Sequence, residues 1–223
     1  MTGPYPQIVS VLTVDASPTA ERTRLVRRAR LLSVLSLGWH AGEFAVALAA
    51  GIAASSIALL GFGMDSLIEA AAGGIVLWRF GADRASSGLA ERRAQRMIAL
   101  SFLALAAYVA VQALRTLFDG QHPESSLVGI GLAAVTAPSM PVLAWAKRRV
   151  GRRLGSAATV SEGAQNLLCA YLALGLLLGL GLNALFGWWW ADPLAALAIA
   201  GVALKEGLDA WRGDSCCEAC GQT

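Results

Sequence analysis

Long apolar stretches alternate with shorter polar segments along the 223-residue chain. About 20 apolar residues in a helix are enough to cross the hydrocarbon core of a bilayer. The pattern predicts six membrane-spanning helices, at about residues 31–51, 55–80, 97–118, 126–146, 157–186 and 193–208. It divides the chain into an N-terminal segment (1–30), a transmembrane domain (31–212) and a short tail (213–223). Ser17-Pro18 predicts the start of a basic helix in the first segment.

Composition places the chain among membrane proteins. Hydrophobic residues make up 56% of the sequence and charged residues 15%, with a mean hydropathy of +0.57, whereas soluble domains carry about 25% charged residues. We therefore predict an all-α integral membrane protein that crosses the cell membrane several times. Six spans leave no room for a soluble catalytic domain, and no nucleophile–base constellation or cofactor fingerprint is present, so an enzyme is not expected.

The basic residues predict the orientation. If there are six spans, all but one of the 18 lysines and arginines lie on one side of the membrane, and the exception is Arg115. Basic loops remain in the cytoplasm, so both termini are predicted to be cytoplasmic. Because topology accounts for the arginines, a nucleic-acid partner is not expected.

Two carboxylates near the middle of the second span are the main functional candidates. Asp65 and Glu69 are four residues apart, a spacing that puts them on one helix face, one turn apart. A carboxylate at this depth costs about 2.5–3.5 kcal/mol on insertion scales. A bound cation is the simplest explanation for two of them on one face.

Glu162 and Asn166 repeat this spacing in the fifth span, which runs antiparallel to the second. The two pairs can meet at similar depth, where four oxygen groups would bind a divalent metal. Two alternatives stay open at this stage: Glu162 lies at the inner interface and reaches water, or Asn166 holds helices together by a hydrogen bond.

His40 and Glu43 share a face of the first span and are candidates for carrying protons or supporting the site from outside it. An ordinary structural hydrogen bond is an equally good interpretation of His40. Cys216, Cys217 and Cys220 lie close enough in the tail to capture a soft metal, or they form a redox-sensitive or incidental tail. Cys169 is interpreted as a small apolar residue.

The segment Ala53-Ala54-Ser55-Ser56-Ile57-Ala58-Leu59-Leu60, followed by Asp65-Ser66-Leu67-Ile68-Glu69, resembles the cation diffusion facilitator (cation efflux) family over about residues 31–212. In that family the second and fifth helices build a tetrahedral metal site. By position Asp65 and Glu69 match its first acidic pair, and Glu162 and Asn166 fall where the family has His and Asp. The resemblance implies a homodimer, and the chain would be a short form without the family's cytoplasmic C-terminal domain.

The sequence thus predicts a secondary transporter that exports a divalent metal from the cytoplasm in exchange for protons. A site without His is harder than usual in the family, so Mn²⁺, Fe²⁺ or Co²⁺ are alternatives to Zn²⁺. Two other functions remain open. One is a membrane protein that binds or senses metal without transporting it, and the other is a membrane assembly protein whose acidic residues pair with His40 or Arg115.

Overall fold

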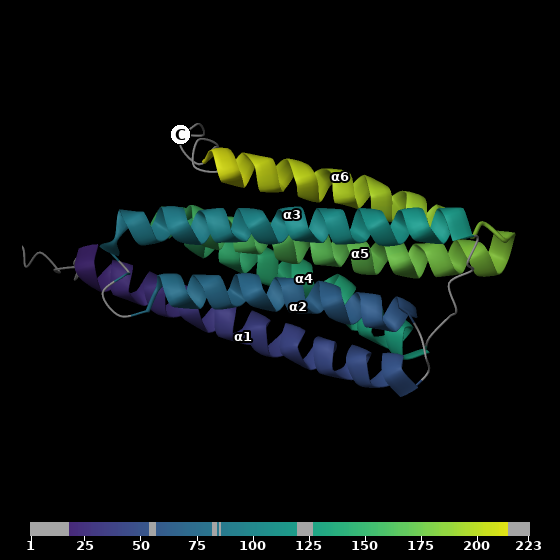
Figure 1. The fold of residues 1–223 in the computed structure, drawn as a ribbon. Coiled ribbons are helices and arrows are strands. Elements are labelled where there is room, and N and C mark those ends of the chain that lie inside the picture. Colours follow the sequence, from purple (N-terminus) through teal and green to yellow (C-terminus); the bar gives the residue numbers. More distant parts are fainter. Residues whose placement is uncertain (1–17, 54–56, 82–83, 85, 120–126, 214–223) are drawn as a thin grey trace, which may run out of the picture.

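Six long helices make up the protein (Figure 1). The computed structural model describes residues 18–53, 57–81, 84, 86–119 and 127–213. Every regular element in these ranges is a helix: α1 (Pro18–Ala53), α2 (Ile57–Arg79), α3 (Gly88–Asp119), α4 (Leu127–Leu154), α5 (Ala157–Phe186) and α6 (Ala191–Arg212). The predicted all-α fold with six long helices is confirmed. The cysteines of the tail, Cys216, Cys217 and Cys220, lie outside the described residues.

Several helices are longer than the apolar stretches that predicted them. Helix α1 begins at Pro18, as predicted, and α5 has the predicted bounds, Ala157–Phe186. The basic segment 147–153, which falls between the predicted spans 126–146 and 157–186, instead forms the last turns of α4, which ends at Leu154. Lysine and arginine are good helix formers, so nothing in this segment stops the helix until Gly155, whose φ is 63°.

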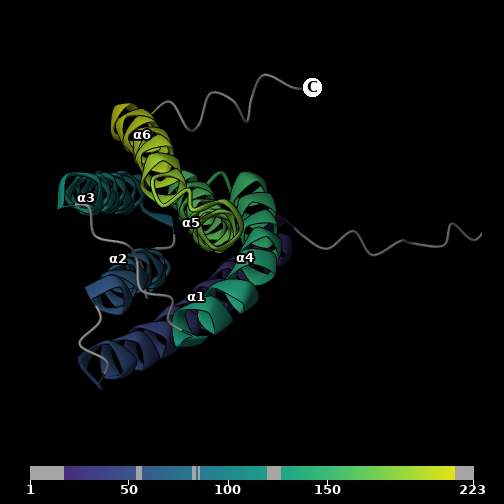
Figure 2. The same ribbon diagram turned by 90° about the vertical axis from the view of Figure 1, so that its right-hand side faces the viewer.

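The helices form a ring in which contacts follow the order α1, α2, α3, α6, α5, α4 and back to α1. Viewed along the bundle, α5 lies between α4 and α6 (Figure 2), and it also contacts α2 and α3. The start of α1 and the end of α6 lie at the same end of the bundle (Figure 1). Over the described residues, α1, α3 and α4 are long and apolar enough by hydropathy to cross a membrane.

Polarity is reversed relative to a soluble protein. Large apolar side chains face outward, for example Leu127, Phe118 and Leu185, which are 86%, 84% and 79% exposed. The interior instead holds His40, Glu43, Asp65, Ser66, Glu69, Thr136, Lys147, Glu162, Gln165 and Asn166, all buried. This arrangement suits a bundle surrounded by lipid, where polar groups are placed toward the bundle interior.

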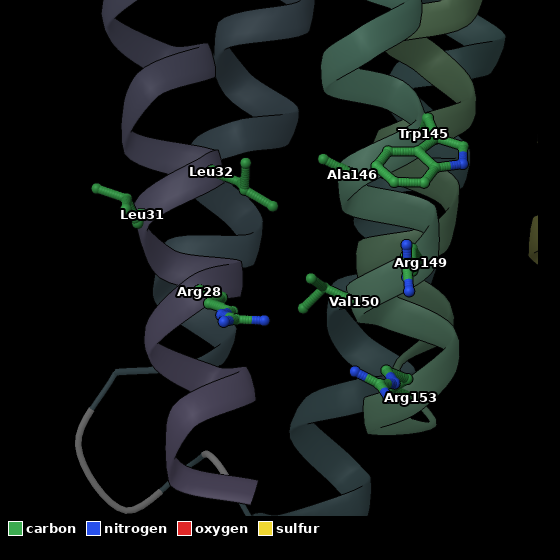
Figure 3. Close-up of a pocket in the computed structure, with 8 residues that line it drawn as sticks. All are labelled: Arg28, Leu31, Leu32, Trp145, Ala146, Arg149, Val150 and Arg153. Carbon is green, nitrogen blue, oxygen red and sulfur yellow. The ribbon is translucent and has the colours of Figure 1, made fainter. Parts of the chain in front are cut away.

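The basic ends of α1 and α4 lie beside each other. A groove of about 390 Å³ between them is lined by Arg28 from α1 and by Trp145, Arg149 and Arg153 from α4 (Figure 3). The guanidinium of Arg149 lies 5.1 Å from the centre of the Trp145 ring. Basic and aromatic side chains are typical of the membrane–water interface, so this groove marks one boundary of the membrane-embedded part.

Small residues allow α4 and α5 to pack closely, as is usual for helices in lipid. A Cβ atom on Gly163 would lie 2.8 Å from Cγ of Arg148 and 3.0 Å from the carbonyl oxygen of Ala144. We expect Gly163→Ala to lower the free energy of unfolding by about 1–3 kcal/mol, the usual cost of overpacking. Denaturant titration in detergent micelles measures this change.

The control is Gly131→Ala, on the neighbouring helix α4, where a Cβ atom would meet nothing within 4 Å. Its free energy of unfolding should stay the same or rise slightly. Equal destabilisation by both substitutions would show that the α4–α5 contact is not the cause.

Candidate metal site

Helix α2 carries the two carboxylates at the centre of the site. Asp65 is 7% exposed and Glu69 is 3% exposed. Within the described residues, Oδ1 of Asp65 and both carboxylate oxygens of Glu69 are buried without a hydrogen-bond partner. Buried polar atoms normally find a partner, so these three oxygens indicate a ligand position.

Helix α1 brings His40 and Glu43 against this pair. The Nδ1 atom of His40 lies 3.0 Å from Oε2 of Glu43, with hydrogen-bond geometry, and 3.1 Å from Oε2 of Glu69, without it. The Glu43 carboxylate also accepts hydrogen bonds from Thr136 on α4 and, at 3.5 Å, from Ser66 on α2. Glu43 is therefore well supplied with donors, unlike Glu69.

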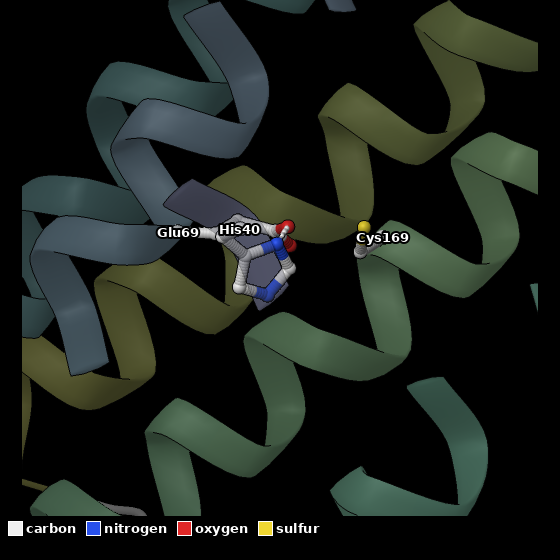
Figure 4. Close-up of side chains that lie close together, drawn as sticks. All are labelled: His40, Glu69 and Cys169. Atoms are coloured by element: carbon white, nitrogen blue, oxygen red, sulfur yellow. Dashed lines mark ion pairs between the residues drawn. The ribbon is translucent and has the colours of Figure 1, made fainter. Parts of the chain in front are cut away.

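Helix α5 contributes Cys169, which is 2% exposed. One ligand atom each from His40, Glu69 and Cys169 lie within 4.8 Å of one another. Figure 4 shows His40 and Glu69 turned toward each other, with Cys169 facing them from α5. A carboxylate, an imidazole and a thiol are all ligands of Zn²⁺ and similar ions, and Asp65 lies one turn before Glu69 on α2.

Glu162 and Asn166 both contact a lysine that lies outside the spans predicted from the sequence, Lys147. The Nζ atom of Lys147 lies 2.6 Å from Oε1 of Glu162 and donates to Oδ1 of Asn166 at 2.7 Å. Lys147 is fully buried. Ser33 on α1 donates to the other Glu162 oxygen at 2.9 Å. An ammonium group thus occupies the position next to Glu162 and Asn166 where the sequence predicted a metal.

The structure connects the two halves of the predicted site through His40. The amide nitrogen of Asn166 lies 3.1 Å from Nε2 of His40, whose other nitrogen faces Glu69. Glu162 lies further from this centre, beside Gly73: a Cβ atom there would be 3.4 Å from Oε1 of Glu162. On α5 it is Cys169, seven residues after Glu162, that reaches the level of Glu69. The assignment of Asp65, Glu69, Glu162 and Asn166 as metal ligands remains a prediction.

Sequence reasoning missed Lys147, Cys169 and Gln165. The hydroxyl of Ser101 donates to Oε1 of Gln165 at 3.3 Å. The buried Nε2 atom of Gln165 has no partner among the described residues. A signal for the two α5 residues was present, because positions 162, 165, 166 and 169 follow the i, i+3, i+4, i+7 spacing of one helix face. The signal for Lys147 is weaker: it continues the buried stripe of Thr136, Met140 and Ala144 on α4.

Charge distinguishes the two pairs of carboxylates. Glu162 faces the Lys147 ammonium, and Glu43 accepts hydrogen bonds from His40, Ser66 and Thr136. Asp65 and Glu69 carry the oxygens that have neither kind of partner among the described residues. When both are ionised, two such carboxylates are electrostatically complementary to one divalent cation.

Comparison with known proteins relates the chain to cation efflux proteins and to a transporter. Residues 33–212 match the cation efflux transmembrane domain family. The chain is also similar to the uncharacterized transporter sll1263 of Synechocystis sp. (strain ATCC 27184 / PCC 6803 / Kazusa), with 26% identity over 190 residues. The alignment covers 78% of this chain and 58% of the relative, so the chain spans less than two thirds of that protein's length.

The buried ion pair gives a prediction about stability. Removing one partner of such a pair leaves an unpaired buried charge and typically costs about 3–5 kcal/mol. We expect Lys147→Met to lower the free energy of unfolding in detergent by this amount. Adding Glu162→Gln should recover most of the loss, because the double variant has no unpaired charge and Gln still accepts from Ser33.

Lys205→Met on α6 is the control, since Lys205 is exposed and exposed charges contribute little. Additive losses in the Lys147→Met/Glu162→Gln double variant would contradict a direct interaction between the two side chains.

Proposed function

The chain belongs to the cation efflux transmembrane domain family, and from this membership we propose that it exports a divalent metal cation from the cytoplasm in exchange for protons. Metal cation transport and a multi-pass location in the membrane follow from the family itself. The proposal adds the kind of cation, the exchange for protons and the residues of the site.

One observation carries the proposal. Oxygens of Asp65 and Glu69 are buried among apolar helices without hydrogen-bond partners in the described residues, beside Cys169 and His40. Leaving such groups unsatisfied is costly in a low-dielectric interior. A cation that binds there removes this cost, and one that leaves must be replaced by something else that neutralises the carboxylates.

Protons are the natural replacement. Metal ligands must be deprotonated, so metal and protons compete for the same carboxylates. In the inward-facing state Asp65, Glu69 and Cys169 take the metal from the cytoplasm. Once the site faces outward, protonation of the carboxylates releases it, as in alternating access around a site near the membrane midplane.

The ligand types suggest which metals are carried. Oxygen ligands alone favour hard ions, whereas thiol and imidazole favour Zn²⁺ and its softer neighbours. A site of Asp65, Glu69 and Cys169 with His40 next to it combines both kinds. We therefore rank Zn²⁺ first, ahead of Mn²⁺, Fe²⁺ and Co²⁺. A homodimer in the membrane, implied by the family resemblance, completes the proposal.

Metal flux in proteoliposomes tests the transport proposal. We expect Zn²⁺ uptake that is accelerated by an imposed pH gradient, with protons moving opposite to the metal. Asp65→Asn keeps the size of the side chain but removes its charge, and we expect it to reduce flux by at least the 10–100-fold that follows loss of an outer-shell partner. Metal affinity should fall about tenfold for each unit by which the pH is lowered, for each proton that the metal displaces.

The control is Asp209→Asn on α6, a half-buried acidic residue near the end of that helix. It should leave flux unchanged. Tight Zn²⁺ binding without flux in the unmodified protein would favour a metal sensor instead. Folded protein that shows neither binding nor flux would exclude the metal site.

Selectivity tests the role of Cys169. Replacing the thiol by a hydroxyl, in Cys169→Ser, keeps a similar size but removes the soft ligand. We expect affinity for Zn²⁺ to fall by at least about tenfold while affinity for Mn²⁺ changes much less. Isothermal titration of both metals measures the ratio, and an equal change for the two ions would contradict ligation by the thiol.

A further inference from the structure

The orientation of the Asn166 side chain is set by Lys147. An ammonium group has three hydrogen-bond donors and no acceptor, so the Asn166 atom that lies 2.7 Å from Nζ must be the amide oxygen. The NH₂ group of the same amide then faces away from Lys147. It lies 3.1 Å from Nε2 of His40, and 3.4 Å from the hydroxyl of Ser36.

This orientation in turn decides where the His40 ring carries its proton. An amide NH₂ group is a donor only, so Nε2 of His40, which faces it, must be the acceptor. A neutral imidazole has one protonated nitrogen, and in this ring it is therefore Nδ1. The Nδ1–H group points at the carboxylates, 3.0 Å from Glu43 and 3.1 Å from Glu69.

We propose that Lys147 is a positioning residue of the metal site: acting through Asn166, it holds the neutral ring of metal-free His40 with its proton on Nδ1, so that His40 donates to Glu43 and must lose that proton before Nδ1 can bind metal. The metal-binding part of this inference rests on the proposed function, whereas the position of the proton does not. Residues that do not contact the metal commonly select the histidine tautomer at metal sites by such a hydrogen bond.

The consequence is that Nδ1 of His40 cannot bind metal while Asn166 keeps its hydrogen bond to Lys147. To bind a metal beside Glu69 and Cys169, Nδ1 of His40 must present a lone pair, so the proton of the neutral ring must reside on Nε2. An Nε2–H group needs an acceptor, which requires the Asn166 amide to turn its oxygen toward His40. That turn breaks the Lys147–Asn166 hydrogen bond, while Lys147 keeps its ion pair with Glu162, 2.6 Å away.

Nuclear magnetic resonance of ¹⁵N-labelled histidine tests the proposal directly. The chain has two histidines, so His122→Gln leaves His40 as the only signal. In this protein, freed of metal with a chelator, we expect a protonated Nδ1 and an unprotonated Nε2. A proton on Nε2, or on both nitrogens, would overturn the proposal.

Two variants test whether Lys147 and Asn166 are the cause. Asn166→Asp offers only acceptors, so it should move the proton to Nε2. Lys147→Met/Glu162→Gln removes the ammonium without leaving an unpaired charge, and Nε2–H should become populated as the amide is released. Lys205→Met should leave the spectrum unchanged. A spectrum that remains the same in both the Asn166→Asp and the double variant would show that the relay does not set the tautomer.

Adding Zn²⁺ separates this proposal from the proposed function. We expect Nδ1 to lose its proton on Zn²⁺ binding. If Zn²⁺ binds and the His40 spectrum stays the same, metal binding does not require the Lys147–Asn166 hydrogen bond to break, and this part of the proposal is overturned. If the protein binds no Zn²⁺, the proposed function fails, and the metal-free spectra still decide whether Lys147 positions His40.

Discussion

The ion pair between Lys147 and Glu162 connects the chain's architecture to its chemistry. Both side chains are buried among apolar helices, where a charge without a partner is strongly destabilising. The pair, 2.6 Å apart, joins α4 to α5, the two helices that pack against each other through Gly163 and Gly151. From it a series of contacts continues through Asn166 and His40 to Glu69. The position of one ammonium group thus affects side chains on α1, α2, α4 and α5.

The buried acidic residues differ in how many hydrogen-bond and charge partners they have. This difference separates structural carboxylates from candidate metal ligands. Glu162 has Lys147 and Ser33, and Glu43 has His40, Ser66 and Thr136. These two carboxylates hold helices together. Asp65 and Glu69 share the same environment without such partners in the described part of the chain. Because an unsatisfied buried carboxylate is costly, the presence of two of them on one helix face supports the proposal that a cation binds there.

Much of this could be predicted from the sequence, and the limits have a clear physical cause. The length of apolar stretches predicted six helices, and the rarity of acidic residues within them singled out Asp65 and Glu69. What could not be predicted is the relative height of neighbouring helices. Boundaries of each span are uncertain by about a turn, and Glu162 and Cys169 are only about two turns apart, so the sequence could not decide which of them lies level with Glu69. For the same reason Lys147 was counted with the neighbouring arginines, although it is buried whereas Arg149 and Arg153 are exposed.

The choice of lysine rather than arginine at position 147 fits this arrangement. A lysine carries a compact charge on a flexible stem, whereas a guanidinium is a planar fork. The single Nζ atom can reach Glu162 and Asn166 together, at 2.6 and 2.7 Å, in a space shared with Ser33 and His40. Its attachment to α4 also limits its reach. It pairs with Glu162, whereas the Glu69 oxygens have no hydrogen-bond partner among the described residues, which fits the proposal that a cation binds at Glu69.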